Sequence, residues 1–149
     1  MKRIGNLYSK VYKLDNLILA ERNARKGKTK KPDVILFDKS KLLHLTNLRQ
    51  VLINQQYKTS KYKTFILYEK KRRKIYKLPY FPDRILHHAV LNITEKIFTK
   101  SFTSNTYSCI KKRGIHLAVR KLKIALKNRY ETKYCLKFDV QKYYPSVNN

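Results

Sequence analysis

One aspartate near the end of the chain lies where apolar and polar residues alternate. In YCLKFDVQKYYPSVNN, residues 134–149, the apolar side chains from Tyr134 to Val140 alternate with Cys135, Lys137 and Asp139. This period of two predicts a strand. A carboxylate on such a strand can be a solvent-facing acid, or it can hold a hard cation such as Mg²⁺, which takes oxygen ligands and bridges to phosphates. Two-metal nucleotidyl transfer needs several carboxylates, so Asp139 alone cannot build that site.

The charge of the chain indicates which partner such chemistry would serve. Thirty-six Lys and Arg stand against nine Asp and Glu in 149 residues, a net charge of +27. An excess of this size favours a polyanion as partner, and nucleic acid is the leading class. A membrane is the weaker prediction, because no run approaches the roughly 20 apolar residues of a spanning helix. The opening MKRIGNLYSKVYKLDN interrupts its apolar positions too often for a signal peptide.

Cysteine usage suggests the compartment. Cys109 and Cys135 are the two cysteines of the chain, too few for a disulfide framework or a zinc site. We expect buried free thiols and a reducing, cytoplasmic location.

Four helices are predicted from apolar residues at helical spacing. They cover about residues 7–19, 42–52, 86–97 and 115–126, with Asp38 or Ser40 available to cap the second. Between the first two, Gly27 and Pro32 punctuate a basic run at residues 24–31, which is either a solvated loop or a loop that contacts phosphates. His87 and His88 are adjacent, so on a helix they face different directions and do not form a ligand pair.

A basic ribbon is predicted between the second and third helices. The β-prone runs Thr64–Tyr68 and Lys74–Tyr80 suggest a hairpin over about residues 64–80. Its tip would carry Lys70, Lys71, Arg72 and Arg73. Tyrosines interleave with these cations, so the ribbon can track phosphates while rings stack on bases. The alternative is an ordinary exposed ribbon whose aromatic residues pair across the strands.

These elements give an α+β plan whose sheet has barely begun. A hairpin and one strand do not cover the apolar faces of four helices as a finished sheet would. The chain therefore looks unfinished, and its length fits one domain or part of a larger one.

Three ordered motifs then resemble reverse transcriptases. KFDVQKYYPSV, residues 137–147, is similar to the first palm motif, in which an aspartate precedes an aromatic residue by five positions. RKIYKLPYFPDRILHHAVLNITEKIF and FTSNTYSCIKKRGIHLAVRKLKIAL resemble the preceding fingers motifs. The most similar subfamily is that of diversity-generating retroelements, relatives of the group II intron enzymes, although Ile110 stands where the group II form has Arg.

The resemblance implies a role for each matching residue. Asp139 would be the first catalytic and metal-binding carboxylate, with the backbone carbonyl of Val140 as a second ligand. Tyr144 would be the steric gate against a ribose 2′-OH, or otherwise a core aromatic residue. The nucleotide's triphosphate would lie near Arg73, Lys74 and Lys77. The template would contact Lys70, Lys71, Arg72, Arg84 and Arg113. Arg84 has the alternative of a helix-start salt bridge with Asp83, and Gly114 would permit close backbone approach at Arg113.

The resemblance also predicts organisation and activity. Residues 1–133 would form the N-terminal extension and fingers of a right-hand polymerase, and residues 134–149 the start of the palm, without a complete palm or a thumb. The complete enzyme would use two Mg²⁺ ions, dNTPs, an RNA template and an RNA–DNA duplex, with a possible accessory protein of the retroelement. No Asp-Asp pair occurs in this sequence, so we expect the chain alone to be inactive. The alternatives are a non-catalytic RNA-binding protein and a basic ribosome-associated protein.

Overall fold

The computed structural model describes residues 3–141 and residue 143. The chain divides into two compact units, Met1–Ser101 and Phe102–Asn149, called here the first and second units. The boundary expected between residues 133 and 134 therefore falls inside the second unit. In the described part of the chain no helix combines the length and the apolar character that crossing a membrane requires.

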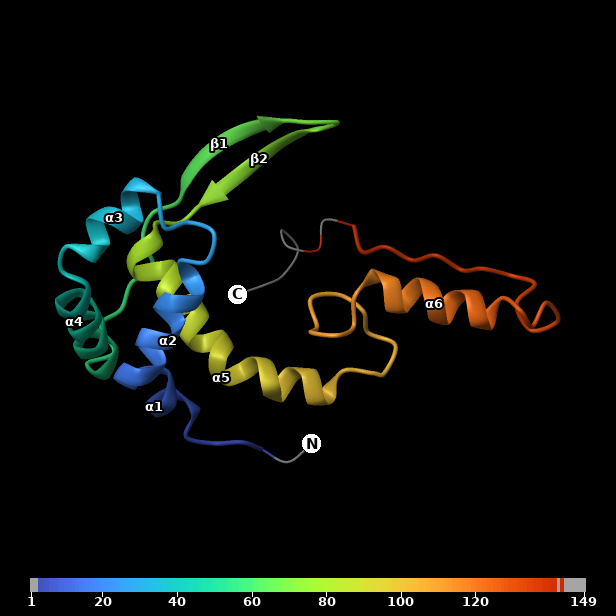
Figure 1. The fold of residues 1–149 in the computed structure, drawn as a ribbon, viewed down its shortest axis with the longest axis horizontal. Coiled ribbons are helices and arrows are strands. Elements are labelled where there is room, and N and C mark those ends of the chain that lie inside the picture. Colours follow the sequence, from blue (N-terminus) through green and yellow to red (C-terminus); the bar gives the residue numbers. More distant parts are fainter. Residues whose placement is uncertain (1–2, 142, 144–149) are drawn as a thin grey trace. The chain divides into compact units, whose positions relative to one another are not determined.

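In its described residues the first unit contains five α-helices (Figure 1). They are α1 (Leu7–Val11), α2 (Leu14–Ala24), α3 (Pro32–Asp38), α4 (Lys41–Ile53) and α5 (Ile85–Ser101). α2 packs against both α4 and α5, and α1 also packs on α5. Ala20 of α2 and Ala89 of α5 are fully buried, and their small side chains allow the two helices to approach closely. Asn16 donates to the carbonyl oxygens of Val11 and Ala89 at 2.9 and 3.0 Å, which ties α2 to its neighbours.

The helix predictions hold in outline and miss two boundaries. The first predicted helix is two helices, because Tyr12 and Lys13 interrupt it and Lys13 has extended backbone angles. Pro32 begins α3 instead of ending a loop. Proline is well tolerated at the first helical position, where its missing N–H would have no partner within the helix. Ser40 precedes α4 without a side-chain capping bond, and Asp38 pairs with Arg25 instead.

A hairpin of residues 63–77 projects from these helices (Figure 1). β1 (Lys63–Tyr68) pairs antiparallel with β2 (Arg72–Lys77), from Lys63 opposite Lys77 to Tyr68 opposite Arg72. The hairpin was predicted correctly, but its second strand begins and ends earlier than expected. Pro79 has no N–H to extend the ladder, and Tyr80 turns into the core. The tip is consequently residues 69–71, and Arg72 and Arg73 lie within the strand.

The turn after the hairpin, η1 (Tyr80–Arg84), is held by a buried acid. Glu21 of α2 is fully buried and accepts hydrogen bonds from Arg25, Lys41 and, at 2.8 Å, the Tyr80 hydroxyl. Burial would raise the pKa of Glu21, but the bonds from Lys41, Arg25 and Tyr80 hold that pKa below its usual value. Because the partners come from the residue after α2, from α4 and from η1, this carboxylate fixes the root of the hairpin to the helices.

Replacing Glu21 with Ala is expected to destabilise the protein by about 3–5 kcal/mol, because Lys41 loses its ion-pair partner, the buried Tyr80 hydroxyl loses its acceptor, and Arg25 keeps only Asp38. The pKa of Glu21 is lowered on folding, so its stabilisation is present above the ordinary carboxyl pKa and is lost as pH falls through the lowered value. Urea denaturation at neutral pH should therefore show a larger difference between parent and variant than denaturation in acid. The exposed Glu95 provides the control, since Glu95→Ala should change stability by no more than about 0.5 kcal/mol. Equal stability of Glu21→Ala and the parent would contradict this role.

The second unit contains α6 (Ile115–Ala125), which has no buried residues. Residues 134–140, predicted as a strand, are not a strand here. They have no strand partner among the described residues, and all of them are exposed. The alternating pattern is present in the sequence, but a strand also needs a neighbour for its backbone groups. The expected first palm strand is thus not formed within the described part of the chain.

Candidate nucleic-acid interface

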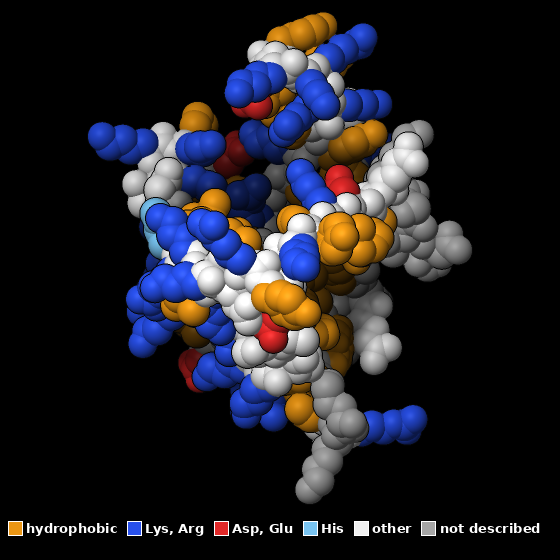
Figure 2. Space-filling view, turned by 90° about the vertical axis from the view of Figure 1, so that its right-hand side faces the viewer, with side chains coloured by type: hydrophobic (Ala, Val, Ile, Leu, Met, Phe, Trp, Pro, Cys, Tyr) orange, Lys and Arg blue, Asp and Glu red, His pale blue; other side chains and the backbone are white. Residues whose placement is uncertain are grey.

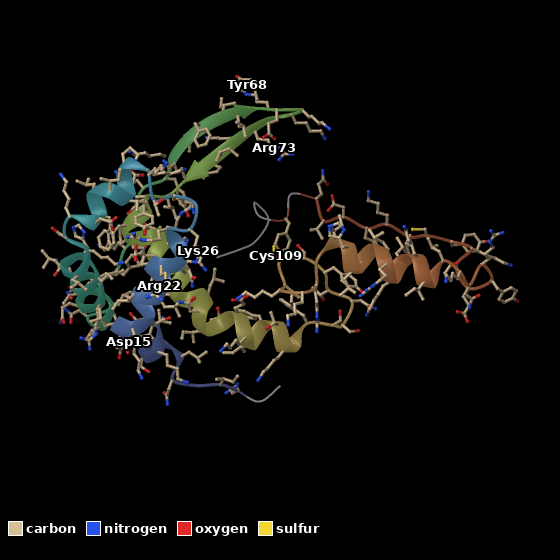
Figure 3. All side chains as sticks on the ribbon, viewed as in Figure 1. Asp15, Arg22, Lys26, Tyr68, Arg73 and Cys109 are labelled. Carbon is tan, nitrogen blue, oxygen red and sulfur yellow. The ribbon has the colours of Figure 1, made fainter. Side chains whose placement is uncertain are left out.

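The hairpin presents cations on both of its faces. Successive side chains of a strand point to opposite sides, so the register assigns each candidate to a face. Arg73 and Lys77 share one face with Lys63, while Arg72 and Lys74 share the other. Figure 3 shows Tyr68 and Arg73 on opposite sides of the ribbon. The three residues expected at the triphosphate therefore do not converge on one side, because Lys74 faces away from Arg73 and Lys77.

Aromatic rings accompany the cations on the face of Lys74. Tyr62 and Tyr76 make an edge-to-face pair with centroids 6.0 Å apart, and the Lys74 ammonium lies 5.5 Å from the Tyr76 ring. The tip adds the exposed Lys70 and Lys71 beside Glu69. The predicted interleaving of cations and exposed tyrosines is thus present in space as well as in sequence. The cross-strand alternative is compatible with the same geometry.

Single substitutions can separate the two faces. Arg73→Ala is expected to weaken RNA binding across all sequences. It should also reduce the slope of log affinity against log salt by about one unit, as loss of one phosphate contact does. Arg73 has Lys63 and Lys77 on its face, so this is the side with more cations at which a phosphate backbone can lie. Arg72→Ala removes the same charge from the other face and is the matched control, for which we expect a smaller effect in the same titration. A larger loss for Arg72→Ala would place the RNA on the face of Lys74.

A second group of cations lies at the root of the hairpin. Lys77 from the end of β2 and Arg84 from η1 line a small cavity of about 60 Å³ together with Lys28 and Lys31 from the loop between α2 and α3. These four residues are called the basic cluster. Burial lowers the pKa of Lys28, and the positive charges of Arg84 and Lys31 lower it further. The same charges reach α5, where burial, then Lys28 and Arg84, lower the pKa of His88.

The basic cluster brings together residues for which the sequence predicted separate roles. Lys77 was a triphosphate candidate, Arg84 a template candidate, and Lys28 and Lys31 part of a loop whose role was left open. The neighbouring positive charges that lower the pKa of Lys28 repel one another, so a bound anion in the basic cluster would be favoured. Asp33 supplies the nearby negative charge, 4.0 Å from the Lys77 ammonium, but both side chains are more than half exposed, so this pair contributes little.

Asp83 does not form the alternative salt bridge with Arg84. Its carboxylate is fully buried and accepts hydrogen bonds from the Tyr57 hydroxyl at 2.5 Å and the Ser60 N–H at 3.0 Å. Burial raises the pKa of Asp83, and the bonds from Ser60 and Tyr57 outweigh that effect, so the pKa is lowered. Asp83 thus anchors the segment before β1, and Arg84 stays with the basic cluster.

Replacing Tyr57 with Phe is expected to cost about 1–3 kcal/mol at pH 7, because buried Asp83 loses a hydrogen-bond donor. Burial and the bond to Asp83 raise the pKa of Tyr57 to about 12. A raised pKa stabilises the fold below the ordinary tyrosine value, and that contribution is lost as pH rises toward 12. The difference between parent and variant in thermal denaturation should therefore shrink in strong alkali. Tyr68→Phe, at an exposed ring of the hairpin, should show no such pH-dependent difference, and a similar response from both variants would contradict the assignment.

Arg113 lies in a loop of the second unit just before α6. Its guanidinium donates to the carbonyl oxygen of Thr103 at 3.2 Å, and Arg113 also forms a short backbone bridge with Ile110. Gly114 has an ordinary extended conformation, with φ −92°, and an added Cβ there would meet no atom within 4 Å. The backbone therefore does not require glycine at this position.

The expected metal ligands are not gathered into a site. Asp139 and Val140 are exposed, and Tyr144 lies outside the described residues. Among the residues that the structure describes, no group of three or more His, Cys, Asp or Glu could hold a metal ion. One carboxylate and one carbonyl do not make the ligand set that two Mg²⁺ ions need.

The cysteines also differ from expectation. Cys109 and Cys135 are free thiols, as predicted, but both are exposed instead of buried. They occupy a loop and an extended segment of the second unit, neither of which contributes to the buried core. Neither cysteine belongs to a candidate metal site among the described residues.

One face of the molecule displays a clear excess of positive charge. On the face of the molecule seen in Figure 2, Lys and Arg side chains far outnumber acidic ones. Comparison of the chain with protein-family models, and with curated proteins, gives no match in either case. The resemblance to reverse transcriptases therefore rests on the three motifs described above.

Proposed function

We propose that this chain is the fingers and first palm motif of a reverse transcriptase, and that it binds RNA and RNA–DNA duplexes. The observation that carries the binding proposal is the basic cluster, in which three separate segments bring Lys28, Lys31, Lys77 and Arg84 to one cavity. Fixed cations at this density attract phosphates and stabilise developing charge on a transferring phosphoryl group. The class of enzyme follows from the resemblance of the motifs.

The two faces of the hairpin distinguish among the residues proposed to contact the triphosphate. Arg73 and Lys77 share a face, and Lys77 also belongs to the basic cluster, so these two are the better placed of the triphosphate candidates. Lys74 faces away from them, on the side of Arg72, so it is the weaker triphosphate candidate. The tip lysines Lys70 and Lys71 and the loop residue Arg113 remain proposed template contacts.

Catalysis would require acids that this sequence lacks. Asp139 and the Val140 carbonyl are proposed ligands of Mg²⁺, which would neutralise charge on the incoming nucleotide. Because the sequence holds no Asp-Asp pair, we expect no polymerisation by this chain alone. We also propose a cytoplasmic location, which the free thiols Cys109 and Cys135 support.

Primer extension tests the proposal directly. This chain is mixed with a separately expressed palm segment that carries an Asp-Asp motif, and dNTP incorporation on an RNA template is measured. Incorporation that needs both chains would support the polymerase, whereas RNA binding without incorporation under any pairing would oppose it.

The second candidate is a non-catalytic RNA-binding protein. It is favoured by one observation, that no acidic cluster is present among the described residues. It makes the same binding predictions and differs only in the complementation test, where it expects no incorporation.

A further inference from the structure

A larger cavity opens on the first unit between α3, α4, η1 and the root of the hairpin. Its volume is about 560 Å³, within the range of small-molecule sites. Residues far apart in the sequence line it, from Asp33 and Leu36 of α3 to Phe81 of η1. Apart from Lys77, none of its lining residues was assigned a role by the sequence motifs. It is called here the aromatic cavity.

Three stacked or tilted rings form one wall of the aromatic cavity. His44 stacks with both Phe37 and Phe81, and its ring centroid lies 5.3 Å from that of Phe37 and 5.1 Å from that of Phe81. The centroids of Phe37 and Phe81 are themselves 5.3 Å apart. His44 and Phe81 are only partly buried, and Leu36 is 66% exposed. Apolar and aromatic surface is therefore accessible from solvent.

Cations also line the aromatic cavity. Lys61, Lys63 and Lys77 line the aromatic cavity, and Asp33 is the one acid among its lining residues. Lys63 and Lys77 stand directly opposite each other across the hairpin. Like charges in that position destabilise a sheet, and an anion between them would remove the repulsion. The cavity thus combines a partly exposed aromatic surface with more positive than negative side chains in its lining.

We propose that the aromatic cavity binds a nucleotide, with its base against the partly exposed rings of His44 and Phe81, which Phe37 backs from the core, and its phosphate at the lysines. Aromatic stacking is tolerant of base identity, and nearby cations take the phosphate. The nucleotide comes either from single-stranded RNA, as a base turned out of the strand, or from solution as a free nucleotide. This site does not depend on polymerase activity, because Asp139 takes no part in it.

Binding of two labelled ten-nucleotide strands to the full chain tests the proposal. One strand is oligoriboadenylate and the other is its abasic counterpart with the same number of phosphates. The parent should bind the strand with bases about tenfold more tightly, as one well-stacked base allows. Equal affinity for the two strands would overturn the proposal.

Two matched variants test whether the preference for strands with bases arises in the aromatic cavity. Leu36→Trp fills the aromatic cavity from an exposed position without changing charge, and should abolish the preference for bases. Leu43→Trp places the same ring at an exposed position of α4 that does not line the cavity, and should keep the preference. If Leu36→Trp also keeps the preference, the bases stack elsewhere and the proposal fails.

Two charge-reversal variants provide a second test of the proposed binding site. Lys61→Glu reverses a cation that lines the cavity, and Lys58→Glu reverses an exposed one nearby that does not. Lys61→Glu should weaken binding of the strand with bases more than Lys58→Glu does; an equal loss of affinity for the two variants would overturn the proposal. Adenosine monophosphate added as competitor then distinguishes the sources. Displacement of the strand from the parent but not from Leu36→Trp identifies a free nucleotide as a ligand, and no displacement identifies the strand.

Discussion

RNA binding by this chain is expected to weaken by about three orders of magnitude or more when salt rises from 50 to 200 mM. Each phosphate neutralised contributes about 0.7 to 0.9 to the slope of log affinity against log salt, and six or more contacts give a loss of this size. The hairpin and the basic cluster together offer that number of cations without drawing on the rest of the +27 charge.

The salt titration is done with single-stranded RNA, an RNA–DNA duplex and DNA of unrelated sequence. The three slopes should differ only by strandedness, with about 0.7 per contact for a single strand against about 0.9 for duplex DNA, because phosphate contacts carry no sequence information. Replacing Lys28 and Lys31 together with Ala should lower the slope by the amount that about two phosphate contacts contribute. The control replaces Lys10 and Lys13 with Ala, which removes the same charge from the α1 region. A slope near zero for the parent would contradict the proposed interface.

Asp139→Ala is expected to abolish nucleotide incorporation in a complemented enzyme that contains the Asp-Asp motif. Losing one ligand of a two-metal site removes several kcal/mol of transition-state stabilisation, and about 1.4 kcal/mol corresponds to tenfold in rate. The expected loss is therefore at least about a hundredfold. In this chain alone the same substitution should leave thermal stability unchanged, because Asp139 is exposed.

Tyr144→Ala in the same complemented enzyme should behave differently. It is expected to keep dNTP incorporation and to admit ribonucleotides, because the proposed gate against the 2′-OH is removed. Primer extension with dNTPs and with rNTPs measures both outcomes. Near-parent extension by Asp139→Ala would show that the catalytic assignment is wrong.

Much of the local structure could be predicted from the sequence. Apolar residues at helical spacing predicted α4, α5 and α6 in place, and two β-prone runs predicted the hairpin. These signals are local, because a helix face or a strand pattern depends on residues a few positions apart. The strand expected at residues 134–140 shows the limit, since an alternating pattern forms a strand only when a neighbour accepts its hydrogen bonds.

The charge, the tyrosine-rich ribbon and the motif containing Asp139 were determined by the sequence itself. Only the tertiary structure decided which charges meet. Glu21 and Tyr80 are 59 residues apart and Tyr57 and Asp83 are 26 apart, yet each pair is joined by a hydrogen bond. The basic cluster similarly joins the α2–α3 loop to β2 and η1. No periodicity encodes such contacts, because the packing of α2 against α4 and α5 brings the segments together only once the whole unit has folded.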